Sequence, residues 1–144
     1  MTLRPVLCAV DISNSDRDVD VLKLANRMAG LDGAQLDVIT VVPDFGMSVV
    51  GSFFEPHHHE QAVEEAQRRL DELVEEAIGA DANAKVRHIV ATGNAYEEIL
   101  HAAELADTGL IVIGAHKPDL KDYLLGPNAS RVVRHSNCSV LVVR

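Results

Sequence analysis

The sequence predicts an α/β fold in which a parallel sheet carries helices on both faces. Two observations lead to this prediction. Short apolar runs recur along the chain and end in turn residues, which is typical of buried parallel strands. Between these runs lie segments whose apolar residues recur at helical spacing. Because this alternation favours parallel strands joined by helical crossovers, we expect a doubly wound, Rossmann-like sheet. Such a sheet binds ligands at the carboxyl ends of its strands.

Length and charge limit the possible functions. The chain has 144 residues, the length of one ordinary domain, so we predict a single domain over residues 1–144. No apolar run approaches the roughly 18 residues that a membrane span needs. The net charge of −9, from 13 basic and 22 acidic residues, argues against nucleic acid or an anionic membrane as partner. A small anionic ligand stays compatible with this charge, because backbone N–H groups can hold it locally.

Both cysteines, Cys8 and Cys138, lie in apolar, strand-like runs. We interpret them as small buried hydrophobic residues in a reducing compartment, not as a disulfide or a metal-binding pair. The N-terminal residues show no signal-peptide cleavage pattern. We therefore expect a cytoplasmic protein.

The first half of the chain begins with a predicted strand at Val6–Val10. A polar loop follows from Asp11, and its side chains can cap the next helix. That helix is predicted over Asp16–Leu31. The second strand is predicted over Gln35–Val42 and ends at Pro43.

The middle of the chain changes character at residues 44–58. This segment is apolar, irregular and interrupted by glycine, and it holds all three phenylalanines, so we interpret it as a flap or an interface segment. The clearest helix pattern follows at Glu60–Ile78, with an apolar stripe opposite a charged face. A loop is predicted over residues 79–84.

The second half repeats the alternation of strand and helix. The predicted elements are a third strand at Lys85–Ala91, a helix at Ala95–Leu105, a fourth strand at Leu110–Ile113, a short helix at Asn128–His135 and a last strand at Val140–Val143.

The stretch from residue 110 to 130 has the pattern of an anion-binding loop. The fourth strand stops at Gly114, which indicates that the backbone turns there or is approached closely. Farther on, Gly126 precedes Pro127, and proline suits the first position of a helix. The free N–H groups of a helix N-terminus can bind a phosphate. The same pattern also occurs where a loop only turns the chain, so both interpretations stay open on spacing alone.

Three blocks together resemble the universal stress protein family, and within it the F-like branch. They are the strand end Val10-Asp11, the stretch from Val112 through Gly126 to His135, and the terminal run from Cys138 to Val143. The resemblance covers the whole chain. It implies a five-stranded parallel sheet in the order 3-2-1-4-5 and an adenine-nucleotide ligand, ATP or AMP, with Mg²⁺ as a possible companion. Family members act as nucleotide-responsive stress regulators.

The chain departs from the signature of the ATP-binding members, which is Gly, two residues, Gly, nine residues, then Gly followed by Ser or Thr. Lys117 stands at the second glycine, the gap to Gly126 is one residue shorter, and Pro127 replaces the Ser or Thr. Lysine restricts the backbone, although its ammonium can reach a phosphate. Loss of one N–H and the hydroxyl weakens the anion site.

The resemblance implies a role for each matching position. Asp11 would accept a hydrogen bond at the adenine end, and the backbone at Val41 and Val42 would border the base. Gly114 to Lys117 would pass beneath the ribose and the α-phosphate, and the start of the last helix would hold the outer phosphates. The predicted binding residues are Ala9, Asp11, Ile12, Val41, Val42, Gly114, His116, Lys117, Gly126, Pro127, Asn128, Ala129 and Ser130.

Simpler roles remain open at several of these positions. Asp11 can also cap the first helix, with or without a contact to adenine, and Lys117 can be a solvated loop charge. His116 is better explained as a phosphate-side donor or a loop-ordering residue than as a catalytic base, so we predict no catalytic residue. The triple histidine His57–His59 lacks metal-ligand spacing, and we predict no metal site there.

Three functions from different classes compete. We favour a nucleotide-binding stress regulator with slow ATP hydrolysis at most, because the chain has no Walker motif. The alternatives are a slow ATPase or adenylate-transferring enzyme, and a ligand-free dimeric interaction module. The implied strand order places Val140–Val143 at a sheet edge, so we also expect a homodimer through that strand, helped by the segment around Phe53 and Phe54.

Overall fold

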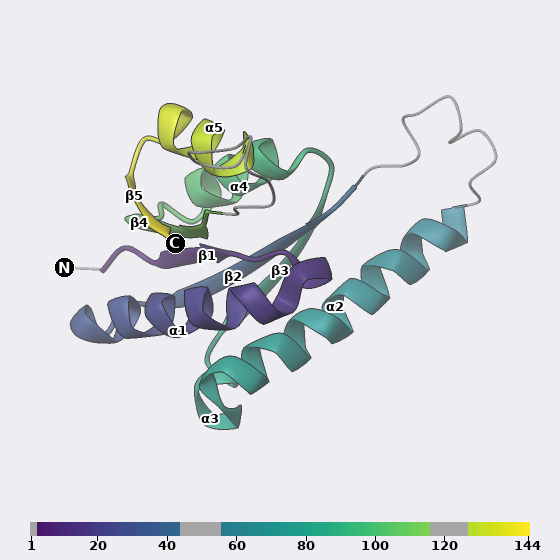
Figure 1. Cartoon of the computed structure of the whole chain (residues 1–144), viewed down its shortest axis with the longest axis horizontal. Coiled ribbons are helices and arrows are strands. Elements are labelled where there is room, and N and C mark those ends of the chain that lie inside the picture. Colours follow the sequence, from purple (N-terminus) through teal and green to yellow (C-terminus); the bar gives the residue numbers. More distant parts are fainter. Residues whose placement is uncertain (1–2, 44–55, 116–126) are drawn as a thin grey trace.

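A five-stranded parallel sheet in the order β3-β2-β1-β4-β5 lies at the centre of the computed structural model (Figure 1). The structure describes residues 3–43, 56–115 and 127–144. The strands are β1 (Val6–Ala9), β2 (Leu36–Val42), β3 (Arg87–Thr92), β4 (Leu110–Gly114) and β5 (Ser139–Val143). Each pair of neighbouring strands is parallel. The predicted fold and strand order are confirmed.

Helices cover both faces of the sheet (Figure 1). On one face α1 (Ser15–Asp32) packs against α2 (Pro56–Ile78), which is followed by the short α3 (Ala80–Asn83). On the other face α4 (Ala95–Leu105) packs against α5 (Pro127–His135). The chain therefore has three layers, with the sheet between two pairs of longer helices.

The central strand β1 divides the hydrophobic core in two. Val6 and Cys8 belong to the cluster beneath α1 and α2, whereas Leu7 and Ala9 belong to the cluster beneath α4 and α5. Successive side chains of a strand point to opposite faces, so a strand covered on both sides must be apolar throughout. This explains the unbroken apolar run in the sequence.

Two of the predicted elements differ from the structure. The predicted loop over residues 79–84 contains α3, because Ala80 to Asn83 form one helical turn after Gly79. The predicted helix at Glu60 begins four residues earlier, at Pro56, where proline is a favourable first helical residue. The triple histidine therefore lies in α2 and not in a loop. The other predicted ends agree with the structure to within one or two residues.

Residues 44–55, which hold Phe53 and Phe54 and most of the predicted flap, lie outside the described residues.

A buried acidic residue joins β2 to β3. Asp37 is fully buried, and its two carboxylate oxygens accept hydrogen bonds from Arg87, at 2.9 Å from Nε and 2.6 Å from Nη2. The two residues are direct partners in the strand register. These hydrogen bonds raise the pKa of Arg87. The bidentate pair fixes the register at the start of β3, since a slip would leave a carboxylate buried without its arginine.

We predict that Arg87→Met lowers the free energy of unfolding by about 2–3 kcal/mol, because it leaves the Asp37 carboxylate buried without its ion-pair partner. Urea unfolding monitored by circular dichroism measures this loss. Arg68→Met is the control, since the exposed Arg68 pairs with Glu65 and Glu72 at the surface of α2 and should have a smaller effect. Equal losses in the two variants would contradict a structural role for the buried pair.

Candidate functional site

A cleft of about 770 Å³ lies over the carboxyl ends of β1, β2 and β4. Its walls come from both helix layers, with α1 and α2 on one side and α4 and α5 on the other. The chain runs outward from β1 through β2 to β3 and then returns to β4 on the other side of β1. The strand order therefore reverses between β1 and β4, where open α/β sheets bind their ligands.

Most of the predicted binding residues meet in this cleft. Nine of the thirteen line it, namely Ala9, Asp11, Ile12, Val41, Val42, Gly114, Pro127, Asn128 and Ala129. Ser130 is exposed on α5 and is not among the lining residues, because successive helical residues point about 100° apart. His116, Lys117 and Gly126 lie outside the described residues.

Sequence reasoning missed a second group of lining residues. They lie on α1, β2, α2 and α4: Arg17, Asp18, Ile39, Thr40, Ala62, Glu65, Ala66, Arg69, Ala95 and Ile99. From the sequence, the apolar residues of this group could be predicted as core positions but not as residues that line a cleft. The signal for Glu65 and Arg69 was their spacing of four residues, which places both on one helix face. Nothing in the sequence indicated that this face borders the cleft.

Asp11 caps the short helical turn that follows β1. Its carboxylate accepts a hydrogen bond from the backbone N–H of Ser13 at 3.0 Å and another from the Ser13 hydroxyl. Asp11 therefore acts as a cap, but of the turn Ile12–Asn14 that precedes α1 and not of the predicted first helix itself. Its implied contact with adenine stays a prediction.

Asp18, on α1, is hydrogen-bonded to the backbone that follows β1. Only 2% of this residue is exposed, and its carboxylate accepts a hydrogen bond from the backbone N–H of Asp11 at 2.5 Å. Burial of the Cys8 thiol, and after it the negative charge of Asp18, raises the pKa of that thiol. Cys8 therefore stays protonated and unreactive, because the thiolate is the nucleophile.

Gly114 ends β4 where side chains from α1 approach closely. A Cβ atom at this position would lie 3.2 Å from Cγ2 of Val21 and 3.5 Å from Oδ1 of Asp18. The interpretation of Gly114 as a point of close approach is confirmed. The absence of a side chain lets α1 pack closely against the end of β4, and Gly114 itself lies in the floor of the cleft.

The N-terminus of α5 opens onto the cleft. The helix begins at Pro127, and its first three residues all line the cleft. Proline has no N–H to offer, so the free donors of the first turn begin at Asn128. These N–H groups and the helix dipole make this end of the cleft suitable for an anion.

The described residues offer few sites for other chemistry. They contain no group of three or more His, Cys, Asp or Glu side chains that could hold a metal ion. His59 lies near Thr92, with 3.2 Å between its Nε2 and the threonine Oγ1. Within the described part of the chain, no helix is both long and apolar enough to cross a membrane.

Comparison with known proteins agrees with this geometry. The sequence model of the Universal stress protein family matches residues 2–144. The chain belongs to this family. Universal stress protein A homolog 1 of Coxiella burnetii is 30% identical to it, over 99% of this chain and 97% of the relative.

Solved structures extend the comparison to the fold. The protein MJ0577 of Methanocaldococcus jannaschii is 28% identical, with a TM-score of 0.78 over 99% of this chain and 96% of that one. The universal stress protein of Archaeoglobus fulgidus, solved in complex with dAMP, is 21% identical, with a TM-score of 0.68 over 100% of both chains. At this identity the second likeness shows the fold alone. Nucleotide binding is thus a property of at least one family structure.

We predict that Asp18→Ala lowers the free energy of unfolding by about 1–3 kcal/mol, because it removes the acceptor of the Asp11 N–H and leaves a small cavity. Asp18→Asn should lose less, since its amide oxygen can still accept that bond. Urea unfolding measures both, with Asp20→Ala as the control, since Asp20 is exposed on the same helix. If Asp18→Ala unfolds like Asp20→Ala, Asp18 does not support β1.

Proposed function

We propose that this protein binds an adenine nucleotide, ATP or AMP, in the cleft and acts as a regulatory protein of the stress response. The observation that carries the proposal is the position of the cleft. It combines the strand-order reversal beside β1 with the N-terminus of α5, so an apolar wall and an anion-binding helix end face the same space. The dAMP complex of the Archaeoglobus protein, which shares this fold, supports the choice of ligand.

Each part of a nucleotide would meet its own group of the described residues. The base would lie against the apolar ends of β2 at Val41 and Val42, close to Asp11. The ribose would cross the side-chain-free floor at Gly114. The phosphates would meet the N–H groups of Asn128 and Ala129, since Pro127 has none.

The proposal extends to the domain organisation of the protein, its location in the cell and its hydrolytic activity. The whole chain would work as one nucleotide-binding domain. Its place would be the cytoplasm, because Cys8 and Cys138 are both free, as expected in a reducing compartment. Mg²⁺ would accompany a bound triphosphate. We expect slow ATP hydrolysis at most, since regulation by occupancy needs only binding.

We predict that ATP binds the wild-type protein with micromolar affinity, about −8 kcal/mol. Asn128→Asp should weaken ATP about tenfold or more and leave adenosine unchanged, because the new carboxylate repels phosphate at the start of α5. The variant should fold normally, since an acidic side chain stabilises a helix N-terminus. Isothermal titration calorimetry measures both ligands, and Asn128→Ser is the uncharged control.

Two results of this titration would contradict the proposal. If wild-type protein binds neither ATP nor AMP, the protein belongs to the ligand-free class. If Asn128→Asp weakens ATP and adenosine equally, the phosphates do not lie at α5.

We also propose a homodimer through β5. This strand is the outer strand of the sheet beside β4, and an outer strand offers its backbone N–H and C=O groups to another chain. Its apolar residues Val140–Val143 are only partly buried. We predict that sedimentation velocity shows a dimer at micromolar concentration. A monomer under these conditions would refute the proposed pairing.

A further inference from the structure

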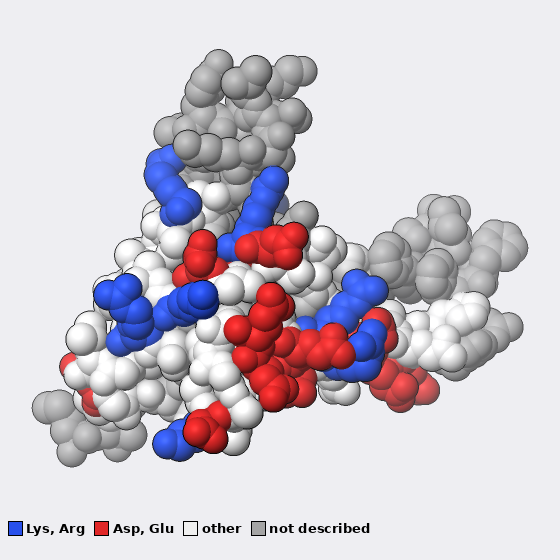
Figure 2. All heavy atoms as spheres, turned by 60° about the horizontal axis from the view of Figure 1, so that its bottom comes forward, with Lys and Arg blue, Asp and Glu red and all other residues white. Residues whose placement is uncertain are grey.

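One wall of the cleft carries two arginines that the proposed function does not use. Arg17 comes from the start of α1 and Arg69 from α2, and both line the cleft. The protein has a net charge of −9. On the side where α1, α2 and α3 lie, acidic side chains form a central group with Lys and Arg around it (Figure 2). The two arginines therefore belong to the cleft and not to a generally basic surface.

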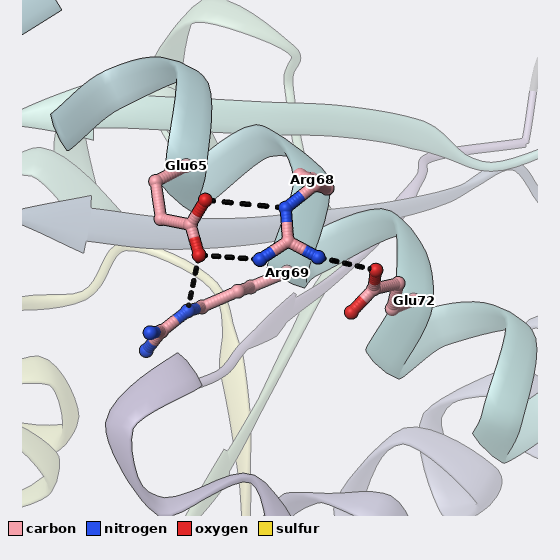
Figure 3. Close-up of polar contacts among 4 residues, drawn as sticks. All are labelled: Glu65, Arg68, Arg69 and Glu72. Atoms are coloured by element: carbon pink, nitrogen blue, oxygen red, sulfur yellow. Dashed lines mark hydrogen bonds and ion pairs between the residues drawn. The ribbon is translucent and has the colours of Figure 1, made fainter. Parts of the chain in front are cut away.

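The guanidinium of Arg69 is held by one edge only. Its Nε donates to Oε1 of Glu65 at 3.0 Å, and Figure 3 shows its far end directed away from that carboxylate. The two terminal nitrogens make no hydrogen bond or ion pair with another described residue, and the same is true of the Arg17 guanidinium within the described part of the chain. Both side chains therefore have N–H donors available to a ligand.

Glu65 acts as the anchor that orients Arg69. It also accepts hydrogen bonds from Arg68, at 3.1 Å from Nε and 2.5 Å from Nη2 (Figure 3). The bonds from Arg68 and then Arg69 lower the pKa of Glu65, so its carboxylate stays ionised. Arg68 differs from Arg69 in two ways. It donates a further hydrogen bond to Glu72, and it does not line the cleft.

Three acidic side chains line the cleft, and one of them, Glu65, is the partner of Arg69. Asp11 and Asp18 line the cleft at the end of β1, and both carboxylates accept hydrogen bonds from nearby backbone N–H groups. Their charge disfavours an anion over β1 itself. Anion-binding groups are thus found at the N-terminus of α5 in one helix layer and at Arg17 and Arg69 in the other, with apolar strand ends such as Ile39 and Val41 between them.

We propose that Arg17 and Arg69 form a second anion subsite, and that the preferred ligand is a purine nucleotide with a second phosphate remote from its 5′ chain. This inference rests on the proposed nucleotide site and names the ligand class more closely. A nucleoside monophosphate uses only the α5 end. A nucleoside bisphosphate, phosphorylated at O5′ and at O3′ or O2′, uses both ends. Arginine suits this role because its planar donors match phosphate oxygens.

The test compares AMP with adenosine 3′,5′-bisphosphate and adenosine 2′,5′-bisphosphate by isothermal titration calorimetry. At least one bisphosphate should bind the wild-type protein about tenfold more tightly than AMP, the gain of one charge-assisted contact. Arg69→Gln should remove this preference and leave AMP affinity unchanged. Arg68→Gln is the matched control, since it also loses a bond to Glu65 on the same helix and should keep the preference. The preference should also shrink as salt is raised.

The failure of this inference differs from failure of the proposed function. If AMP binds and neither bisphosphate binds more tightly, the second subsite is refuted and the nucleotide site stands. If Arg68→Gln and Arg69→Gln lose the preference equally, the arginines act through α2 and not on the ligand, which also overturns the inference. If neither AMP nor a bisphosphate binds, the proposed function itself has failed.

Discussion

The structure depends on the burial of β1 between two helix layers and two neighbouring strands. The side chains of β1 alternate between the two halves of the core, so the strand cannot shift by one residue without exchanging the two faces. Its carboxyl end is therefore held in a fixed place. That end carries Asp11, which caps the next turn, and lies beside the end of β4, where the strand order reverses. The position of the cleft follows from this arrangement.

Two buried carboxylates show how polar groups are tolerated in this core. Asp37 forms a bidentate ion pair with Arg87. Asp18 accepts a hydrogen bond from the backbone N–H of Asp11 at the edge of the cleft. Burying a charge is unfavourable unless hydrogen bonds compensate. The first carboxylate sets the register of β2 and β3 near the start of both strands, at residues that do not line the cleft. The second connects α1 to the end of β1 and lies near Gly114, so it belongs to the floor of the cleft. The same chemistry thus has different consequences at the two ends of the sheet.

The sequence predicted the strands and the strand end at Asp11 because both depend on local patterns. An apolar run covered on both faces, followed by a polar cap, needs no knowledge of distant residues. The start of α5 at Pro127 was close to prediction for the same reason. The strand order itself came from the resemblance to a family and not from periodicity.

The remaining features depend on contacts between distant segments. The helical turn α3 lies within the predicted loop over residues 79–84, because four residues are too few to show a helical period in the sequence. The pair of Asp37 and Arg87 joins residues 50 positions apart, which no local pattern reveals. The contribution of α2 to the cleft depends on how that helix crosses α1. From the sequence alone its charged face is predicted to be solvated surface, whereas in the folded chain Arg69 lines the cleft.

Amide hydrogen exchange with and without ATP tests the central claim most directly, because it reports where a ligand lies. If the cleft is the nucleotide site, ATP should slow exchange at residues 11–13 after β1 and in the first turn of α5, from Asn128 onward. The turn α3 follows the C-terminal end of α2, whereas the cleft-lining residues of that helix lie between Ala62 and Arg69, so α3 should exchange at the same rate in both states. Protection that appears elsewhere, or no change at saturating ATP, would contradict the account.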